Sequence, residues 1–180
     1  ISYNSIQFGY DASTNISGGI LRTGGAFFAG NTATTFNPTG GDVEIVGEIN
    51  DDAIYCGNGN YFFNLRINRS PEVACYLNLF PVTIKNDLTI QSGILNSNGF
   101  DIYIEGDWIN LVGADGFVEG SNRVVFNGDG IFQYCSTEEF NILEVDRPAG
   151  WSLWNLPGAS ISCQKYDWTQ GGISLYEANG

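Results

Sequence analysis

The chain has 180 residues, of which 43% are hydrophobic and 14% aromatic, so it can bury a core and is not a disordered tail. It contains no histidine, which excludes Ser-His-Asp and Cys-His catalysis and histidine-ligated metal sites. Its 20 acidic and 7 basic residues give a net charge of −13, and so acidic a surface repels phosphate backbones, which argues against nucleic acid as a partner.

Methionine and long apolar runs are both absent from the sequence. No stretch approaches the roughly 18 apolar residues of a transmembrane helix, and no signal peptide is present, so we expect no membrane span in this segment. Ile1 is not a translation start, and we therefore expect residues 1–180 to be one segment of a longer chain. The acidic balance suits an extracellular setting, where Ca²⁺ can bridge carboxylates, although solubility alone also explains it.

Short alternating strands separated by turn residues follow one another along the chain. Phe63, Leu65 and Ile67 share one parity, with polar residues between them. No window keeps the apolar spacing of an amphipathic helix, so we expect little or no helix. Further strands predicted by the same alternation, each followed by Asn, Asp, Ser or Gly, are 82–85, 88–91, 100–105 and 124–127.

Two kinds of internal similarity indicate a repeat of roughly 75–80 residues. Cys56 and Cys135 each precede a stretch in which an aromatic residue, Asn, alternating aliphatics and Arg lead to Pro. Glycine-centred turns at Gly19, Gly93 and Gly172 recur at nearly the same interval. We therefore expect a single β-solenoid segment over 1–180, with internal units at 16–86 and 87–166 and a partial third unit at 167–180.

Short strands at near-regular spacing occur in sandwiches, barrels and solenoids. A sandwich needs no sequence repeat, whereas a unit of this length divides into three or four coils of roughly 20–25 residues. We therefore predict an all-β fold, a parallel β-helix or β-solenoid. Strands of successive coils would stack in it, and inward side chains would form ladders.

Four cysteines, Cys56, Cys75, Cys135 and Cys163, form no Cys-x-x-Cys motif, which argues against a zinc ribbon or a thioredoxin-type site. An even number in an acidic chain favours an oxidised compartment, and three pairings are possible. The pairings Cys56–Cys75 and Cys135–Cys163 are favoured because each separation is about one coil, and coils about 4.8 Å apart suit disulfide geometry. Free thiols stacked in the core are the alternative.

Residues 87–148 carry an ordered set of short motifs: Gly106-Asp-Trp108-Ile-Asn110, Val124-Val-Phe126-Asn-Gly128 and Phe140-Asn-Ile-Leu143. This order resembles repeat modules of large secreted and cell-surface proteins of Bacteroidota. The similarity is weak over 1–60, where the Trp motif is missing. The resemblance implies export by a type IX-like route, a cell-surface or released location, and a scaffolding or adhesive role. It implies no catalytic residue.

Two acidic segments are candidate chemical sites. Asp51-Asp52 resembles the carboxylate pair of pectin-cleaving β-helix hydrolases, whose acid and base need a set separation and one raised pKa. The Asn-Thr-Asp, His-Gly and basic motifs of those enzymes are absent, so we predict a polar turn there and no catalytic residue. Asp115-Gly116 and Gly128-Asp129-Gly130 offer oxygen ligands for Ca²⁺ but lack the EF-hand spacing, which favours tight turns. We therefore expect no cofactor, with Ca²⁺ as the open alternative.

Large aromatic residues are candidate sugar contacts, because exposed rings stack on the apolar faces of sugars. The four tryptophans are Trp108, Trp151, Trp154 and Trp168. Trp151 and Trp154 lie in an irregular stretch before a Pro-Gly pair, and we name them as candidate glycan contacts. The alternative is that they cover the core.

These observations favour a non-enzymatic structural or adhesive segment of a secreted or cell-surface bacterial protein, in which stacked coils form a rigid rod. Its partners would be other segments of the same large protein, surface glycans or other surface proteins. One alternative is a carbohydrate-binding or polysaccharide-active β-helix module. Another is a subunit of a filament or large complex whose acidic face meets a basic partner or Ca²⁺.

Overall fold

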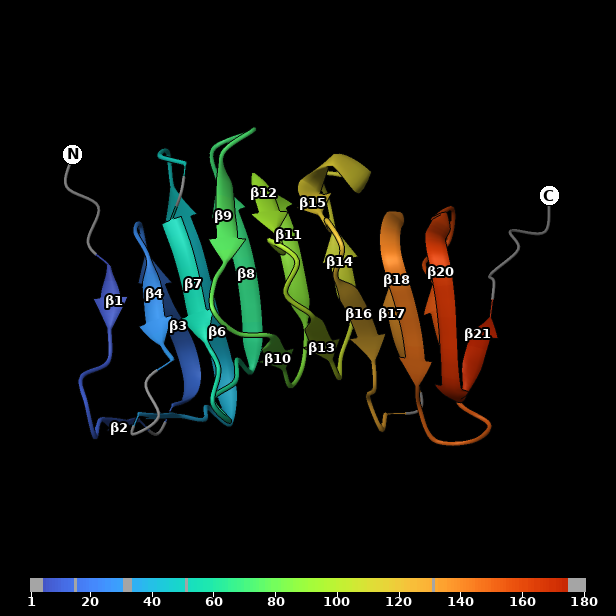
Figure 1. Ribbon diagram of the computed structural model, residues 1–180, viewed down its shortest axis with the longest axis horizontal. Helices are drawn as coiled ribbons and strands as arrows, with labels where there is room; N and C mark the ends of the chain where they lie inside the picture. The colour runs from blue at the N-terminus through green and yellow to red at the C-terminus, as the bar shows by residue number, and fades with distance from the viewer. Residues whose placement is uncertain (1–4, 15, 31–33, 51, 131, 175–180) are drawn as a thin grey trace.

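The polypeptide winds into a parallel β-solenoid of about 7 turns with about 22 residues per turn. Figure 1 shows the strands of successive turns stacked side by side along the long axis. The computed structural model describes residues 5–14, 16–30, 34–50, 52–130 and 132–174. Within these ranges the one helical element is a 3₁₀ turn, η1, at Ala114–Gly116. The predicted fold class, coil length and scarcity of helix are therefore confirmed. No helix in the described ranges has the length and apolar character needed to cross a bilayer.

Three long sheets form the faces of the solenoid, and the pairings among their described strands are parallel. The eight-stranded sheet contains β3 (Ser17–Thr23), β6 (Gly40–Gly47), β8 (Asn64–Arg69), β11 (Leu88–Ser92), β14 (Trp108–Asn110), β17 (Phe132–Cys135), β19 (Ser152–Asn155) and β21 (Gly172–Ser174). The six-stranded sheet contains β1 (Ile6–Gln7), β4 (Phe27–Ala29), β7 (Asp52–Cys56), β9 (Ala74–Leu77), β12 (Ile94–Asn96) and β15 (Phe117–Val118). The five-stranded sheet contains β10 (Val82–Ile84), β13 (Ile102–Ile104), β16 (Arg123–Phe126), β18 (Glu138–Asp146) and β20 (Ile161–Gln170). In the first coils the chain forms two other strands, β2 (Ser13–Thr14) and β5 (Thr35–Phe36), between the six-stranded and the eight-stranded sheet. Later coils form the strands of the five-stranded sheet at this point of the chain.

Inward side chains stack into ladders, because strand alternation sends every second residue to the core. Leu65 stacks on Leu88, and Leu88 stacks on Trp108 in the next coil. Beside this ladder Ile67 stacks on Ile90. All five side chains are at most 1% exposed. Burying a side chain of this size contributes about 1.5–3 kcal/mol, so the ladders supply the main force that holds the coils together.

A ladder of Asn and Asp side chains holds the corner at which the strands of the eight-stranded sheet begin. A side-chain oxygen of Asn64 accepts the backbone N–H of Asp87 at 3.1 Å, and one of Asp87 accepts the backbone N–H of Asp107 at 2.9 Å. Asp107 accepts the backbone N–H of Tyr134 at 2.8 Å. Each acceptor lies one coil before its donor, so this ladder satisfies the turn N–H groups and fixes the register of four coils.

A buried arginine anchors the corner that follows β8. Arg69 is 2% exposed, donates to the carbonyl of Val46 at 3.1 Å and pairs with Asp52 at 2.6 Å. The backbone of Gly93, in the next coil, lies directly against this side chain at φ +81°. A Cβ at position 93 would come 2.7 Å from the Cβ of Arg69 and 2.8 Å from the carbonyl oxygen of Val73. The corner therefore requires both the arginine and the glycine.

A second corner, after β18, is built in the same way. Arg147 is 0% exposed and donates to the carbonyls of Ser152 and Gly130. A Cβ on Gly171, at φ +84°, would come 2.9 Å from the Cβ of Arg147. Arg69 ends a strand of the eight-stranded sheet, whereas Arg147 follows a strand of the five-stranded sheet. The two similar stretches of sequence, after Cys56 and after Cys135, therefore form the same type of corner but at different corners of the solenoid cross-section. The internal units at 16–86, 87–166 and 167–180 stay a prediction.

The predicted disulfides are wrong, because all four cysteines are free. Cys75 lies opposite Asp52 of the neighbouring coil, four residues from Cys56 along the strand, which places the two Cα atoms about 14 Å apart. Cys135 belongs to the eight-stranded sheet and Cys163 to the five-stranded sheet. A separation of one coil brings two cysteines together only when they also share a register position.

The glycine at the Arg69 corner can be tested against a matched glycine in a more open setting. We expect Gly93→Ala to lower the free energy of unfolding by about 3 kcal/mol, from backbone strain and overpacking together. Gly59 has a similar φ of +86°, but none of the described atoms lies within 4 Å of its Cβ position, so Gly59→Ala should cost about 1 kcal/mol. Urea denaturation measures both changes, and equal costs would contradict the described packing.

The free thiols can be counted directly. Cys56, Cys75 and Cys135 are buried, and burial raises the pKa of each thiol, that of Cys75 to about 12. We expect a chromogenic disulfide reagent to modify only the exposed Cys163 in the native protein, and all four thiols after denaturation without reductant. A denatured count below four would restore a disulfide.

Candidate functional site

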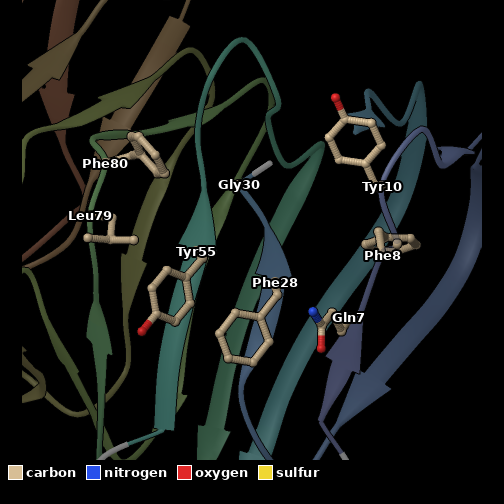
Figure 2. Close-up of a pocket in the computed structure, with 9 residues that line it drawn as sticks. Gln7, Phe8, Tyr10, Phe28, Gly30, Tyr55, Leu79 and Phe80 are labelled. Atoms are coloured by element: carbon tan, nitrogen blue, oxygen red, sulfur yellow. The ribbon is translucent and has the colours of Figure 1, made fainter. Parts of the chain in front are cut away.

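An aromatic pocket of about 390 Å³ lies on the outer side of the six-stranded sheet, as Figure 2 shows. Its lining comes from four successive coils, so no single stretch of sequence encodes it. We call it the aromatic hollow, and its lining residues are Gln7, Phe8, Gly9, Tyr10, Phe28, Gly30, Tyr55, Leu79 and Phe80.

The centre of the aromatic hollow is a stacked pair of rings. Gln7 of β1, Phe28 of β4 and Tyr55 of β7 occupy equivalent outward positions in successive coils. The Phe28 and Tyr55 rings lie side by side, 4.5 Å between centroids and 22° between planes. The side-chain amide of Asn78 donates to the Tyr55 hydroxyl at 3.1 Å, which fixes the orientation of that ring. Stacking at the coil spacing therefore presents two ordered rings to solvent.

The far side of the aromatic hollow depends on two glycines. A Cβ on Gly30 would lie 3.1 Å from the Phe80 ring, and one on Gly57 would lie 2.4 Å from the Cβ and Cγ of Phe80. Bare backbone at both positions thus makes room for Phe80. The preceding residue, Leu79, has a φ of +68° and is 61% exposed. A left-handed, exposed leucine carries about 1 kcal/mol of backbone strain, and such strain is typical of binding surfaces.

The described lining of the aromatic hollow carries no charged side chain, although the chain as a whole has a net charge of −13. Tyr10 is 73% exposed at its edge, so a large aromatic surface is left in water. Its polar groups are the amide of Gln7 and the phenol hydroxyls. Such a surface can stack on a flat apolar face and exchange hydrogen bonds at its margin, and its described lining contains no Asp, Glu, Lys, Arg or Cys side chain.

The predicted glycan contacts Trp151 and Trp154 lie elsewhere, and the irregular stretch expected for them is largely a strand. Trp154 is in β19, and both tryptophans are partly buried. The Trp154 ring packs edge-on against Phe132, with centroids 6.4 Å apart, and Phe132 is 59% exposed. These residues form a separate aromatic patch on the eight-stranded sheet. Their role as sugar contacts stays a prediction.

The polar turn predicted at Asp51-Asp52 is wrong for Asp52, which is the first residue of strand β7. Asp51 lies outside the described residues. The carboxylate of Asp52 is at the start of β7 and pairs with the buried guanidinium of Arg69, so it holds the corner described above. Neutralising it would leave a buried cation with a weaker partner. This contact gives Asp52 a structural reason to be acidic.

Of the two segments considered for Ca²⁺, one forms a tight turn. Asp115 lies in the 3₁₀ turn η1, whereas Asp129 is exposed in an irregular connection between Gly128 and Gly130. Across the described ranges, no three His, Cys, Asp or Glu side chains gather closely enough to hold a metal ion.

Glu138 is a buried acid that the sequence did not single out. It is 1% exposed, and its carboxylate accepts the indole N–H of Trp108 at 2.9 Å and the side-chain amide of Asn110 at 2.8 Å. Burial raises the pKa of this carboxyl to about 7, although these two hydrogen bonds oppose the shift. The group is enclosed by the core, where its protonation state affects the stability of the fold.

The aromatic hollow could not be predicted from the sequence, because its residues are far apart along the chain. Phe28 stacks on Tyr55, and Ile54 stacks on Leu77 one coil later, but the first pair is separated by a longer stretch of chain than the second. Because the coils differ in length, register partners are not separated by a constant number of residues and cannot be identified from spacing alone. The one available signal was that Gly30 and Gly57 follow strands that contain Phe28 and Tyr55 at matching positions.

Comparisons of the chain with protein-family models, with curated proteins and with solved structures found no match. The parallel register of the described strands is what establishes the solenoid.

The raised pKa of Glu138 predicts that the fold loses stability as the pH rises. The folded pKa of about 7 exceeds the ordinary value of 4.5, so the stabilisation is complete below about pH 4.5 and is lost as the pH rises through about 7. We expect this carboxyl to remove about 3 kcal/mol from the free energy of unfolding between those limits. Glu138→Gln should abolish that component, whereas the exposed neighbour change Glu139→Gln should keep it. Urea denaturation across the pH range decides, and identical profiles for wild type and Glu138→Gln would refute the assignment.

Proposed function

We propose that this chain is a non-enzymatic structural segment of a secreted or cell-surface protein, a rigid rod that spaces and presents an adhesive surface. The observation that carries the proposal is the unbroken stack of strands from β3 to β21 in one sheet. In such a stack each coil buries its inner face against its neighbours, so the rod is stiff along its whole length.

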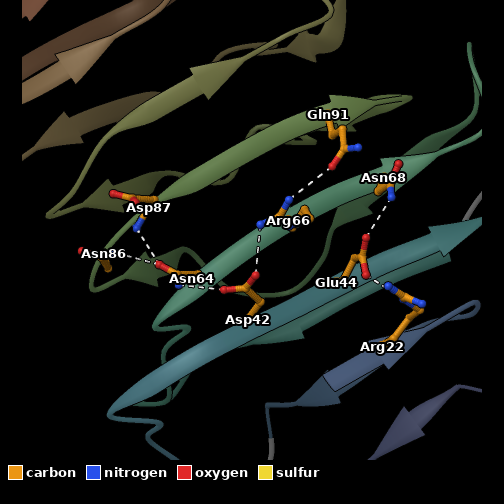
Figure 3. Close-up of polar contacts among 9 residues, drawn as sticks. All are labelled: Arg22, Asp42, Glu44, Asn64, Arg66, Asn68, Asn86, Asp87 and Gln91. Atoms are coloured by element: carbon orange, nitrogen blue, oxygen red, sulfur yellow. Dashed lines mark hydrogen bonds and ion pairs between the residues drawn. The ribbon is translucent and has the colours of Figure 1, made fainter. Parts of the chain in front are cut away.

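Polar side chains on the outer face of the eight-stranded sheet support this proposal, as Figure 3 shows. Glu44 pairs with Arg22 of the preceding coil at 2.6 Å and accepts a hydrogen bond from Asn68 of the following coil at 2.8 Å. Arg66 pairs with Asp42 of the preceding coil at 3.1 Å and donates to Gln91 of the following coil at 3.2 Å. We call these residues, with Asn64, Asn86 and Asp87, the polar ladder.

The contacts of the polar ladder run along the rod axis, from one coil to the next, and this direction matters more for the stiffness of the rod than the strength of any one contact. Partly exposed ion pairs contribute only about 0–1 kcal/mol each. However, each contact joins two different coils, so together they resist sliding and bending of the stack. The charged groups on this face are engaged with one another, which is the arrangement expected of a structural surface and not of a catalytic one.

The proposed location rests on the acidic surface and on the resemblance to secreted modules of Bacteroidota, which implies export by a type IX-like route. All four cysteines are free, so no disulfide supports an oxidising compartment. The aromatic hollow favours carbohydrate binding as a second function carried by the same rod. Polysaccharide cleavage has less support, because Asp52 is engaged with Arg69.

Rigidity can be measured between the two ends of the rod, which lie at opposite sides of Figure 1. Spin labels on the natural thiol of Cys163 and on Ile20→Cys, where the native side chain is 61% exposed, would report the distance between β20 and β3. We expect a single narrow distribution centred at about 30 Å and insensitive to salt, since about six coil steps of 4.8 Å separate them. A broad distribution would overturn the rod.

The same protein, incubated with neutral and acidic polysaccharides with and without Ca²⁺, should release no new reducing ends. Release that disappears in Asp52→Asn, with the fold retained, would replace the structural proposal by an enzymatic one. Circular dichroism of the variant supplies the folding control.

A further inference from the structure

We propose that the aromatic hollow binds a neutral carbohydrate chain, held by ring stacking and by hydrogen bonds from uncharged groups. This inference rests on the proposed adhesive function and names its ligand. The site lies on the six-stranded sheet, away from Trp151 and Trp154.

The shape of the aromatic hollow suits an extended ligand. Its lining crosses four coils, so its long dimension follows the rod axis over about 14 Å, three steps of the strand spacing. A volume of about 390 Å³ falls within the range of small-molecule sites. An oligosaccharide fills such a trough along its length, whereas a single sugar ring would leave most of it in water.

The chemistry of the lining matches a sugar better than a purely apolar ligand. Sugar rings have a C–H face that stacks on aromatic rings and an edge of hydroxyls that needs hydrogen-bond partners. Phe28, Tyr10 and Phe80 supply ring surface around the aromatic hollow. The amide of Gln7 and the hydroxyl of Tyr55 supply polar partners within the same lining.

Ordered rings lower the entropy lost on binding. The Tyr55 hydroxyl is already held by Asn78, and Phe28 is held against Tyr55. Phe80 lies in the space left by Gly30 and Gly57. The aromatic hollow is therefore largely formed before any ligand arrives.

Charge selects the class of carbohydrate. Among the described residues, no charged side chain lines the aromatic hollow, so this lining would not pair with a uronate or sulfate group. The net charge of −13 adds long-range repulsion against any polyanion. The ligand is therefore a neutral glycan.

A peptide strand is disfavoured by the backbone of the sheet. An extended peptide binds by adding to an open strand edge. The strand β4 at the centre of the aromatic hollow is paired with β1 on one side and with β7 on the other. Its backbone groups are thus engaged, and a peptide lying on this face would leave its own N–H and C=O groups without partners from the sheet.

The binding test uses the whole chain and calorimetric titration. The probes are cello-, xylo- and manno-oligosaccharides as neutral chains, an oligogalacturonate as an acidic chain, and a peptide rich in Phe and Trp. We expect Kd values for at least one neutral oligosaccharide to rise about tenfold in Tyr10→Ala and in Tyr55→Ala, since one stacked ring contributes up to about a factor of ten. Tyr55→Phe, which keeps the ring and removes the hydroxyl, should weaken binding less.

A control lies on the five-stranded sheet. Trp168→Ala removes a ring that is 64% exposed on β20 and should leave Kd unchanged. An equal loss in this control would overturn the assignment to the aromatic hollow. Binding of the acidic chain or the peptide alone would overturn the ligand class, and no binding of any neutral chain would overturn the site.

Failure of this inference is separable from failure of the proposed function. The spin-label distance does not depend on a ligand, so a narrow distribution with no sugar binding would leave the rod standing and remove the aromatic hollow as a site. Tyr10 is 73% exposed, so Tyr10→Ala should keep the fold, and an unchanged unfolding midpoint confirms this.

Discussion

The structure depends on the stacking of each coil on the next at the spacing of parallel strands. That spacing places inward apolar residues such as Leu65, Leu88 and Trp108 in direct contact, and it brings outward residues of neighbouring coils equally close. The core ladders, the Asn and Asp ladder at the corner and the polar ladder are three results of one register. A register shift of one residue would turn the inward apolar side chains of a strand to solvent. All three ladders therefore stabilise the same register between neighbouring coils.

The same constraint creates the candidate site. Stacking at a fixed outward position brings Phe28 and Tyr55 together, and the bare backbone of Gly30 and Gly57 leaves space for Phe80. A rod of this kind has few ways to form a concave surface, because its strands present flat faces. The strained Leu79 turn and the glycines produce one by changing the outline of successive coils. Scaffold and site are thus separable: the core ladders hold the rod, and residues at its surface set what it contacts.

Alternation of apolar and polar residues predicted the strands and the inward parity of Leu65 and Ile67, since burial follows the strand period directly. The internal similarity was what favoured a solenoid with coils of roughly 20–25 residues over a sandwich or a barrel. Neither signal was enough to predict contacts between coils. Cys56 and Cys75 are about one coil apart but four residues out of register, and coils of unequal length occur within one sheet. The aromatic hollow depends on coils of unequal length, and the hydrogen bonds of the buried Glu138 come from Trp108 and Asn110 of another coil. Neither feature could therefore be predicted from the pattern of residues along the chain.

Engineered cross-linking between stacked positions, in a Cys163→Ser background, tests the strand register of the solenoid directly. Thr83 and Tyr103 are register partners in β10 and β13, so Thr83→Cys with Tyr103→Cys places two Cα atoms about 4.8 Å apart, within disulfide range. Thr83→Cys with Asp101→Cys is two residues out of register, about 8 Å, beyond that range. We expect rapid oxidation of the first pair and none of the second. Equal or preferred cross-linking of the second pair would contradict the register on which the solenoid, its corners and its aromatic hollow all depend.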